Sequence, residues 1–211
     1  MQIKNKEIII IGYSGHALVV ADILMQLGYS IKGYMEKVEV ANNLLKLPYF
    51  GFEQNPKDLS KIYGTLVFPA IGDNLIRSKV FSLLKQKGFE IPKAVSQKAD
   101  VSDTSNIDEG TLVCSGACIN PFATIGKGVI INTGAIVEHQ CIIDDFVHIA
   151  PGAVLTGNVK VGEGSFIGAN ATIKQGIIIG ENVIIGAGAV VINNIPDNTV
   201  FIGNPAKKLI K

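Results

Sequence analysis

The stretch IDEGTLVCSGACINPFATIGKGVIINTGAIVEHQCII, residues 107–143, decides the fold of the second half of the chain. Every sixth residue in it is a branched aliphatic, and the rhythm runs without an insertion from residue 101 to residue 191. The positions are Val101, Ile107, Val113, Ile119, Ile125, Ile131, Val137, Ile143, Ile149, Leu155, Val161, Ile167, Ile173, Ile179, Ile185 and Val191. A period of six fits neither a helix nor one long strand, but it fits a short strand and a turn repeated around a coil. We therefore expect a parallel β-helix built of hexapeptides.

The interior of this coil follows from the alternation of side chains along each strand. The residue two places before each aliphatic points to the same side, and it is often alanine, as at Ala117, Ala135 and Ala153. Three hexads complete one triangular coil, so the repeats predict about five coils. The spacing does not fix the handedness of the coil.

The first ninety residues follow a different pattern. Residues 7–11 form an isoleucine-rich strand, a tight turn follows at 12–15, and residues 16–27 form a helix closed by Gly28. We expect further strands at 30–35, 65–70 and 89–91 and a second helix at 74–86. Alternating strands and helices predict a small Rossmann-like α/β domain, which we place at residues 1–92. The β-helix and a short C-terminal tail then occupy residues 93–211.

Composition excludes several classes of protein. The chain has 19 basic and 18 acidic side chains among 211 residues and no run of five like charges, so we expect no nucleic-acid partner. Four isoleucines near the start are far short of a membrane span, and we expect neither a membrane segment nor a signal peptide. Three scattered cysteines, Cys114, Cys118 and Cys141, form no disulfide framework, which favours a reducing cytoplasm.

Two loops of the first domain are candidate ligand sites. In a parallel sheet, ligands bind at the carboxyl ends of the strands, where a helix N-terminus favours phosphate. The turn GYSGH at residues 12–16 and the loop AIGDN at residues 70–74 both have this position. Neither contains a full dinucleotide fingerprint, and tight strand-to-helix turns also use glycine for geometry alone.

Histidines supply the candidate chemistry of the second domain. His139 follows Val137 at a corner of the coil, and His148 precedes Ile149 and faces outward. An imidazole at such a corner suits general base catalysis, although an ordinary surface histidine fits the same pattern. A zinc site needs three ligands, and the remaining histidine, His16, belongs to the other domain. We therefore expect no metal.

Four segments of the chain carry a family resemblance. VEHQCIIDDFVHIAPGA at 137–153, GNVKVGEGSFIGANATI at 157–173, FIGNPAK at 201–207 and IIIIGYSGHALVVADIL at 8–24 resemble the bacterial hexapeptide-repeat sugar acetyltransferases. The closest subgroup holds nucleotide-4-amino-sugar N-acetyltransferases and sialic acid O-acetyltransferases. The resemblance implies a left-handed β-helix, a homotrimer, acetyl-CoA bound between adjacent coils, and a sugar nucleotide bound by the N-terminal domain.

The resemblance also implies a role for particular residues. His139 corresponds to the general base, flanked by Glu138 and Gln140. His148 corresponds to a contact near the thioester of acetyl-CoA, and Gly157 to a backbone N–H that stabilises the oxyanion. The remaining correspondences are Ala169 and Ala187 for the pantetheine arm, and Ser14, Gly15, His16, Glu36, Lys37 and Gly72 for the sugar nucleotide.

The chain departs from the family pattern at two places. Gln140 stands where an acidic residue usually follows the catalytic histidine; an amide can fix the tautomer of the imidazole but cannot offset its positive charge, unless Glu138 compensates. Glu36-Lys37 stands where an acidic pair often follows the second strand, and this leaves the base of the nucleotide open.

These observations lead to one expected function and two alternatives. We expect an acetyl-CoA-dependent N-acetyltransferase that acylates the 4-amine of a nucleotide-linked amino-deoxysugar, with His139 as general base and no covalent intermediate. One alternative is O-acetylation of a sugar hydroxyl, which needs a stronger base. The other is a non-catalytic trimeric scaffold that binds sugar nucleotides.

Overall fold

The computed structural model describes residues 6–209, and the chain divides into two compact units after Ala94. This division lies two residues beyond the boundary suggested by the sequence. Each unit is described by itself.

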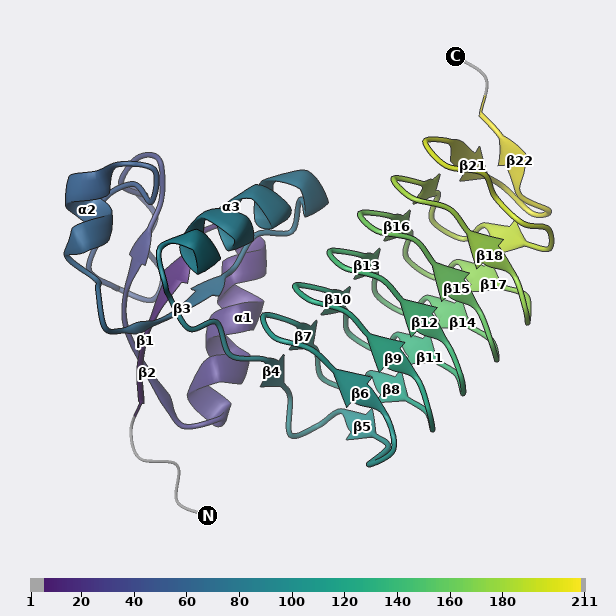
Figure 1. The fold of residues 1–211 in the computed structure, drawn as a ribbon, viewed down its shortest axis with the longest axis horizontal. Coiled ribbons are helices and arrows are strands. Elements are labelled where there is room, and N and C mark those ends of the chain that lie inside the picture. Colours follow the sequence, from purple (N-terminus) through teal and green to yellow (C-terminus); the bar gives the residue numbers. More distant parts are fainter. Residues whose placement is uncertain (1–5, 210–211) are drawn as a thin grey trace. The chain divides into compact units, whose positions relative to one another are not determined.

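The first unit is a small α/β domain around a parallel sheet of three strands in the order β2-β1-β3 (Figure 1). The strands are β1 (Lys6–Ile11), β2 (Tyr29–Met35) and β3 (Leu66–Pro69), and the helices are α1 (Gly15–Gln26), α2 (Pro56–Ser60) and α3 (Asn74–Gln86). Residues 8–11 are buried on both faces of the central strand, which explains an unbroken run of isoleucine rather than an alternating pattern.

Local signals fix the ends of the helices in this unit. The side chain of Asp73 accepts a hydrogen bond from the Ile76 N–H at 2.8 Å and caps α3. Helix α1 ends at Gln26, and Gly28 closes it with a φ of 83°, which glycine adopts without strain. One expectation was wrong, and one element was missed. Residues 89–91 form no strand, because only one backbone hydrogen bond, from Val67 N–H to Glu90, ties them to the sheet, and the short helix α2 was not expected.

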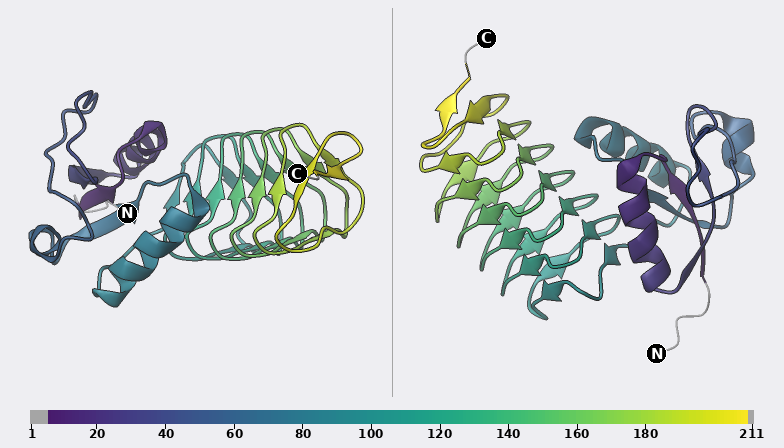
Figure 2. Two further views of the ribbon diagram at one scale, coloured as in Figure 1. Left: turned by 90° about the horizontal axis from the view of Figure 1, so that it is seen from above. Right: turned by 180° about the vertical axis from the view of Figure 1, so that it is seen from behind.

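The second unit confirms the hexapeptide coil: it is a left-handed parallel β-helix with three faces (Figure 2). Face 1 contains β4 (Ala94–Val95), β7 (Leu112–Val113), β10 (Ile130–Ile131), β13 (His148–Ile149), β16 (Phe166–Ile167), β19 (Ile184–Ile185), β21 (Val200–Ile202) and β22 (Lys207–Lys208). Face 2 contains β5 (Asp100–Val101), β8 (Cys118–Ile119), β11 (Ile136–Val137), β14 (Val154–Leu155), β17 (Thr172–Ile173) and β20 (Val190–Val191). Face 3 contains β6 (Asn106–Ile107), β9 (Thr124–Ile125), β12 (Ile142–Ile143), β15 (Lys160–Val161) and β18 (Ile178–Ile179).

Register along the solenoid is 18 residues per coil, because Ile130 pairs with His148 and His148 pairs with Phe166. The sixth-residue aliphatics and the alanines two places before them line one continuous buried core. Strand β22 pairs antiparallel with β21 at the C-terminal end of face 1.

The corners explain the glycine content of the chain. From residue 110 to residue 188, the third residue after each aliphatic has a positive φ between 54° and 74°, or 52° at Asn182. Glycine and asparagine hold most of these positions, since they adopt the left-handed conformation most readily. The three other residues are Phe122, Gln140 and Phe146.

Candidate active site

His139 lies at the corner between face 2 and face 3, which we call the histidine corner: residues 121–122, 139–140, 157–158 and 175–176. Its backbone carbonyl accepts a hydrogen bond from the Asn158 N–H at 2.9 Å, which ties it to the next coil. Its ring lies against the backbone of Gly157: a Cβ at residue 157 would come within 2.5 Å of Cε1 and 2.6 Å of Nε2. The structure therefore brings these two predicted residues together.

Gln140 sets the orientation of the imidazole. Its Oε1 lies 3.2 Å from His139 Nδ1, and because an amide oxygen can only accept, Nδ1 carries the proton. The other ring nitrogen, Nε2, is then the basic one. Gln140 makes this contact from a left-handed backbone conformation with φ of 60°.

Glu138 does not join this contact. Among the described residues, no hydrogen bond or ion pair links its carboxylate to His139. Its negative charge instead contributes to the raised thiol pKa values of Cys118 and Cys141, for which burial is the larger cause. Glu138 thus makes no direct contact with His139 through which it could compensate for the neutral side chain of Gln140.

The backbone N–H of Gly157 is the candidate oxyanion donor. Gly157 is buried, and within the described part of the chain its N–H donates to no acceptor. A buried N–H without an acceptor is costly unless a ligand or water satisfies it. Because Gly157 lies beneath the His139 ring, the Gly157 N–H donor and the His139 imidazole lie close together.

His148 lies on face 1, away from the histidine corner. It points away from the core of the coil, as expected, but its side chain is only 9% exposed and is not an ordinary surface histidine. Its Nε2 accepts a hydrogen bond from the Asn132 amide at 3.1 Å, and Phe166 packs edge-on against the ring at 5.0 Å. The contact between Asn132 and His148 was not predicted; the 18-residue coil was the signal for it, because it stacks His148 beside Ile130 and thus next to Asn132.

Ala169 and Ala187 stack at a different corner, between face 1 and face 2, where the Gly188 N–H donates to the Ala169 carbonyl at 2.8 Å. We call it the small-residue corner: residues 115–116, 133–134, 151–152, 169–170 and 187–188. One chain thus divides the predicted acetyl-CoA residues into two sets. Gly157 lies with His139, whereas His148, Ala169 and Ala187 lie on the other side of face 2.

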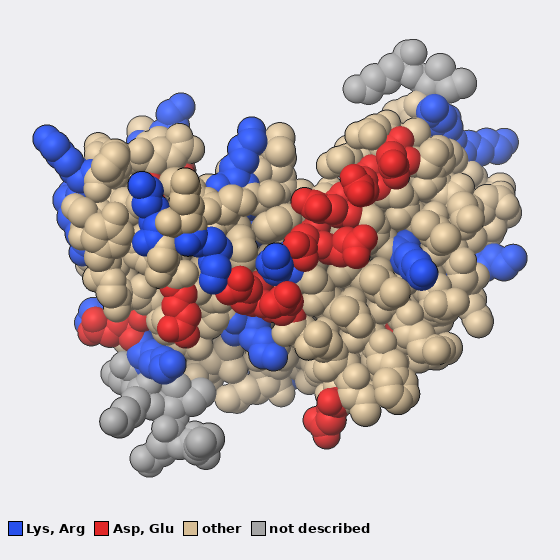
Figure 3. Space-filling view, in the orientation of Figure 1, with Lys and Arg blue, Asp and Glu red and all other residues tan. Residues whose placement is uncertain are grey.

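The third corner, between face 3 and face 1, is acidic, and Figure 3 shows a band of carboxylates along the solenoid. Backbone and side-chain hydrogen bonds between successive coils stack Glu109, Lys127, Asp145, Glu163, Glu181 and Asp197 in this column. Within the residues that define them, the histidine corner and the small-residue corner contain no Lys, Arg, Asp or Glu, and Lys98 precedes the first coil of the small-residue corner. A polyanion such as coenzyme A is therefore repelled by only one of the three corners.

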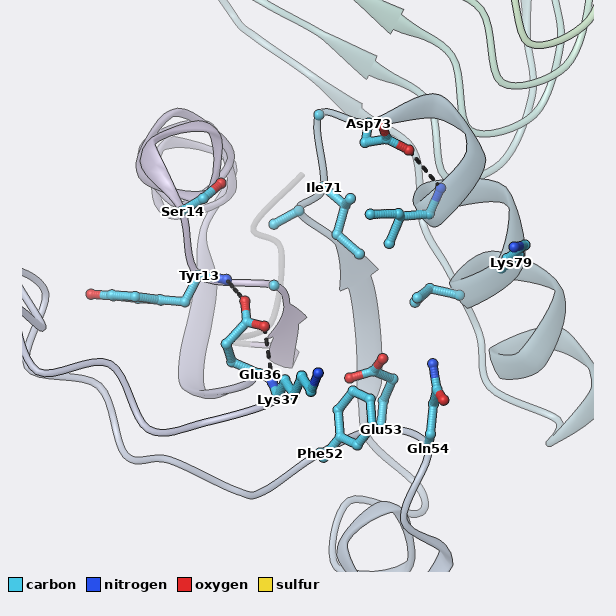
Figure 4. A pocket seen from close by; sticks show the side chains of 15 residues that line it. Tyr13, Ser14, Glu36, Lys37, Phe52, Glu53, Gln54, Ile71, Asp73 and Lys79 are labelled. Carbon is cyan, nitrogen blue, oxygen red and sulfur yellow. Dashed lines mark hydrogen bonds between the residues drawn. The ribbon is translucent and has the colours of Figure 1, made fainter.

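The first unit contains a cavity of about 650 Å³ at the carboxyl ends of its strands (Figure 4). Four predicted residues line it: Ser14, Glu36, Lys37 and Gly72. Gly15 and His16 adjoin the cavity without lining it. This volume lies in the range of small-molecule and cofactor sites.

Hydrogen bonds hold the walls of this cavity. Both oxygens of Glu36 accept backbone N–H groups, from Tyr13 at 3.1 Å and from Lys37 at 2.9 Å. The hydroxyl of Ser14 makes no capping bond at the start of α1, which leaves it for a ligand. In the loop before α3, the buried Arg77 donates to the carbonyls of Ile71 and Gly72 at 3.1 and 3.0 Å.

His16 is electrically neutral in this setting. Burial, with a further contribution from Arg77, lowers its pKa from 6.5 to about 4. Its ring packs 3.9 Å from the position that a Cβ on Gly72 would take. Near the cavity, the neutral ring of His16 therefore provides packing and an N–H donor, but no positive charge. Neither Arg77 nor the cavity residue Glu53 was predicted, because no periodicity or motif in the sequence marks either of them.

Two features are absent from the described residues, 6–209. No helix there is long and apolar enough to cross a membrane. No group of three His, Cys, Asp or Glu side chains there is arranged to hold a metal ion.

Comparison with known proteins gives matches over both units. The PglD N-terminal domain matches residues 7–84, and the bacterial transferase hexapeptide (six repeats) matches residues 122–157 and 158–193. The acetyltransferase domain of PglB from Neisseria gonorrhoeae FA1090, solved with acetyl coenzyme A, is 34% identical with a TM-score of 0.90, covering 98% of this chain and 100% of that chain.

Two other solved structures are similar over almost the whole chain. PerB from Caulobacter crescentus, solved with CoA and GDP-perosamine, is 35% identical over 100% of both chains, with a TM-score of 0.90. WeeI from Acinetobacter baumannii AYE is 29% identical, covering 97% of this chain and 100% of that chain, with a TM-score of 0.86.

Proposed function

The chain belongs to the hexapeptide-repeat sugar acetyltransferases that carry a PglD N-terminal domain, and from this membership we propose the reaction that it catalyses. It is an acetyl-CoA-dependent acyltransferase. The acceptor that we propose is the 4-amino group of a nucleotide-linked amino-deoxysugar. The full-length likeness to PerB, which was solved with a GDP-linked amino sugar, supports this acceptor class.

The pair formed by His139 and Gly157 carries the chemical part of the proposal. The sugar amine attacks the thioester carbonyl of acetyl-CoA while Nε2 of His139 removes its proton. The negative charge that develops on the carbonyl oxygen is stabilised by the Gly157 N–H. The C–S bond then breaks, the amide forms, and the coenzyme A thiolate takes the proton back from the imidazolium.

The neutral amide of Gln140 favours an amine over a hydroxyl as the acceptor. Gln140 holds the tautomer of His139 but does not offset the positive charge that the ring acquires. An amine is a good nucleophile that needs only modest help, whereas a hydroxyl needs a stronger base. Direct O-acetylation is therefore the weaker alternative.

A homotrimer completes the acetyl-CoA site in this proposal. Two sets of residues on opposite sides of face 2 form one site if the histidine corner of one copy faces the small-residue corner of the next. Beyond the exposed Asp100 of β5, the outward strand residues of face 2 form an uncharged, half-buried column suited to contact between copies: Cys118, Ile136, Val154, Thr172 and Val190. The acidic corner then stays clear of the coenzyme A phosphates.

The cavity of the first unit is the proposed sugar-nucleotide site. Its volume, the free hydroxyl of Ser14 and the N-terminal ends of α1 and α3 beside it suit a diphosphate. Ser14, Glu36, Lys37 and Gly72 line the site, and Gly15 and His16 support it from behind.

A direct assay tests the function. Purified protein is mixed with acetyl-CoA, a thiol reagent and a panel of nucleotide-linked 4-amino sugars, with matched 4-hydroxy sugars as the O-acetylation arm. We expect thiol release only with amines, at least about 100-fold slower in His139→Ala and unchanged in Thr124→Ala, a control on face 3. Undiminished release in His139→Ala would overturn the assigned base. Calorimetry that shows nucleotide binding, but neither binding heat from acetyl-CoA nor competition by it, would favour a scaffold.

A further inference from the structure

Glu53 is a buried carboxylate that no role described so far uses. It lines the cavity of the first unit and is only 6% exposed, and Figure 4 shows its carboxylate pointing into the open space. Hydrogen bonds fix the segment around it: the Glu36 N–H donates to the Gly51 carbonyl at 3.0 Å, and the Asn55 N–H donates to the Phe52 carbonyl at 2.9 Å across Glu53 itself. The chain thus holds Glu53 in place against the cavity.

No other residue satisfies this carboxylate. Apart from its own backbone amide, no donor in the described part of the chain bonds to it, and no lysine or arginine there forms an ion pair with it. Burial raises the pKa of Glu53, and the nearby charge of Glu36 raises it further. A buried acceptor-only group of this kind needs hydrogen-bond donors, and the open cavity is the place from which they can come.

The walls of the cavity give a bound nucleotide a direction. The loops before α1 and α3, with Ser14 and Asp73, lie on one side of the cavity, and residues 52–54 lie on the other (Figure 4). Helix N-termini attract phosphate, whereas a buried carboxylate repels it. The diphosphate therefore belongs beside the helices, and the nucleobase belongs beside Phe52 and Glu53. The aromatic ring of Phe52 offers a stacking surface for the nucleobase.

We propose that Glu53 reads the nucleobase of the sugar nucleotide and selects guanine. This rests on the proposed function, in which the cavity holds a nucleotide-linked sugar. A carboxylate can only accept, and guanine presents two adjacent donors, N1–H and the N2 amino group, that match its two oxygens. Uracil and thymine present one N–H between two carbonyl oxygens, which the carboxylate repels. Lys37, which also lines the cavity, supplies a donor for guanine O6.

Isothermal titration of the full chain with nucleoside diphosphates tests this assignment. We expect GDP to bind at least about tenfold more tightly than UDP or dTDP. Inosine diphosphate, which lacks only the N2 amino group, should bind between them. This ranking is measured on the wild-type protein and does not depend on whether a variant folds.

The variant Glu53→Gln tests whether Glu53 causes this order of affinities. The amide of the variant keeps one acceptor and introduces a donor. We therefore expect the affinity for GDP to fall about tenfold and the affinity for UDP to change less than threefold, and GDP and inosine diphosphate should then bind with similar affinities. Glu90→Gln, an exposed carboxylate of the same unit, is the matched control and should leave the ranking unchanged.

Two negative results are distinguishable. UDP or dTDP binding as tightly as GDP, or a guanine preference that survives in Glu53→Gln, would overturn the role of Glu53 and leave nucleotide binding intact. Failure of every nucleoside diphosphate to bind at millimolar concentration would overturn the proposed nucleotide site itself, and the inference with it.

Discussion

The imidazole of His139 rests on the backbone of Gly157, one coil further along, with no room for a side chain between them. A Cβ on Gly157 would lie 2.5 Å from Cε1, well inside van der Waals contact. Because this residue has an ordinary backbone conformation, the glycine is required by the close approach of the ring and not by a positive φ. The pair fixes both the base and the buried N–H beside it.

Gly157→Ala should therefore displace the His139 ring, the proposed general base. We expect kcat for thiol release to fall about 100-fold, because a shift of about 1 Å misplaces the base. The free energy of unfolding should fall by only about 1–3 kcal/mol, since the exposed ring can rotate away. Gly88→Ala, in the first unit, is the control: its Cβ meets nothing within 4 Å, and only its left-handed backbone is strained. Equal activity in the two variants would contradict a close contact between His139 and residue 157.

Gln140→Glu should strengthen the base. A carboxylate beside Nδ1 would stabilise the imidazolium that forms during proton transfer, which the native amide cannot do. We expect kcat to rise several-fold, by roughly 1 kcal/mol of barrier, and the acid limb of the pH–rate profile to move to higher pH. Gln140→Leu, which removes the acceptor, should lower kcat. A rate in Gln140→Leu equal to wild type would show that the tautomer of His139 is set elsewhere.

The coil was predictable from sequence because its cause is periodic. A residue that points inward every sixth position must be aliphatic, so the rhythm of Val101 to Val191 predicted the strands, the core and the corner that holds His139. Residues brought together by stacking were harder to find. Asn132 and His148 are 16 residues apart, and their contact follows only when the coil length of 18 residues is applied to pairs of side chains.

The cavity of the first unit was only partly predictable. Its turn at residues 12–16 has a position that general rules assign to ligands, but Glu53 lies in an irregular segment whose burial depends on long-range contacts with β2. The burial of His148 was not predictable either, because the alternation of side chains gives direction and not exposure.

His16 should make the stability of the protein depend on pH. Its pKa is about 4 when folded against an ordinary value of 6.5, so the folded state favours the neutral ring. This contribution is complete above about pH 6.5 and is lost as the pH falls toward 4, because the unfolded chain binds the proton first. The loss is on the order of 3 kcal/mol.

Urea unfolding of wild type and His16→Gln between pH 7.5 and about 4 measures this term. The difference between the two proteins should shrink as the pH falls, since carboxylates shared by both cancel. A constant difference would show that His16 has the same pKa in the folded and unfolded states. Nucleotide affinity should not rise between pH 7.5 and about 5.5 on account of His16, because the ring stays neutral there.

Phe122 and Phe146 should respond in opposite ways to replacement by glycine. Both adopt left-handed backbone conformations, with φ of 62° and 57°, which cost about 1 kcal/mol in a residue other than glycine. Phe122 is 67% exposed, so Phe122→Gly relieves strain with little loss of packing and should stabilise the fold by about 1 kcal/mol. Phe146 is 7% exposed, and Phe146→Gly should destabilise the fold by about 2–4 kcal/mol. A loss of stability in Phe122→Gly at constant protein concentration would instead indicate that this ring is buried against another copy.

Mixing two inactive variants tests whether the acetyl-CoA site is shared between copies. His139→Ala removes the base from the histidine corner, and Ala187→Trp fills the small-residue corner, which lies on the other side of face 2. If a site takes one corner from each of two copies, a refolded 1:1 mixture contains interfaces in which both corners are intact. Random assembly makes these roughly a quarter of all interfaces, so about a quarter of wild-type activity should return. Each variant refolded alone is the control. A mixture no more active than its components would mean that both corners must come from one chain, and the proposed trimeric site would be wrong.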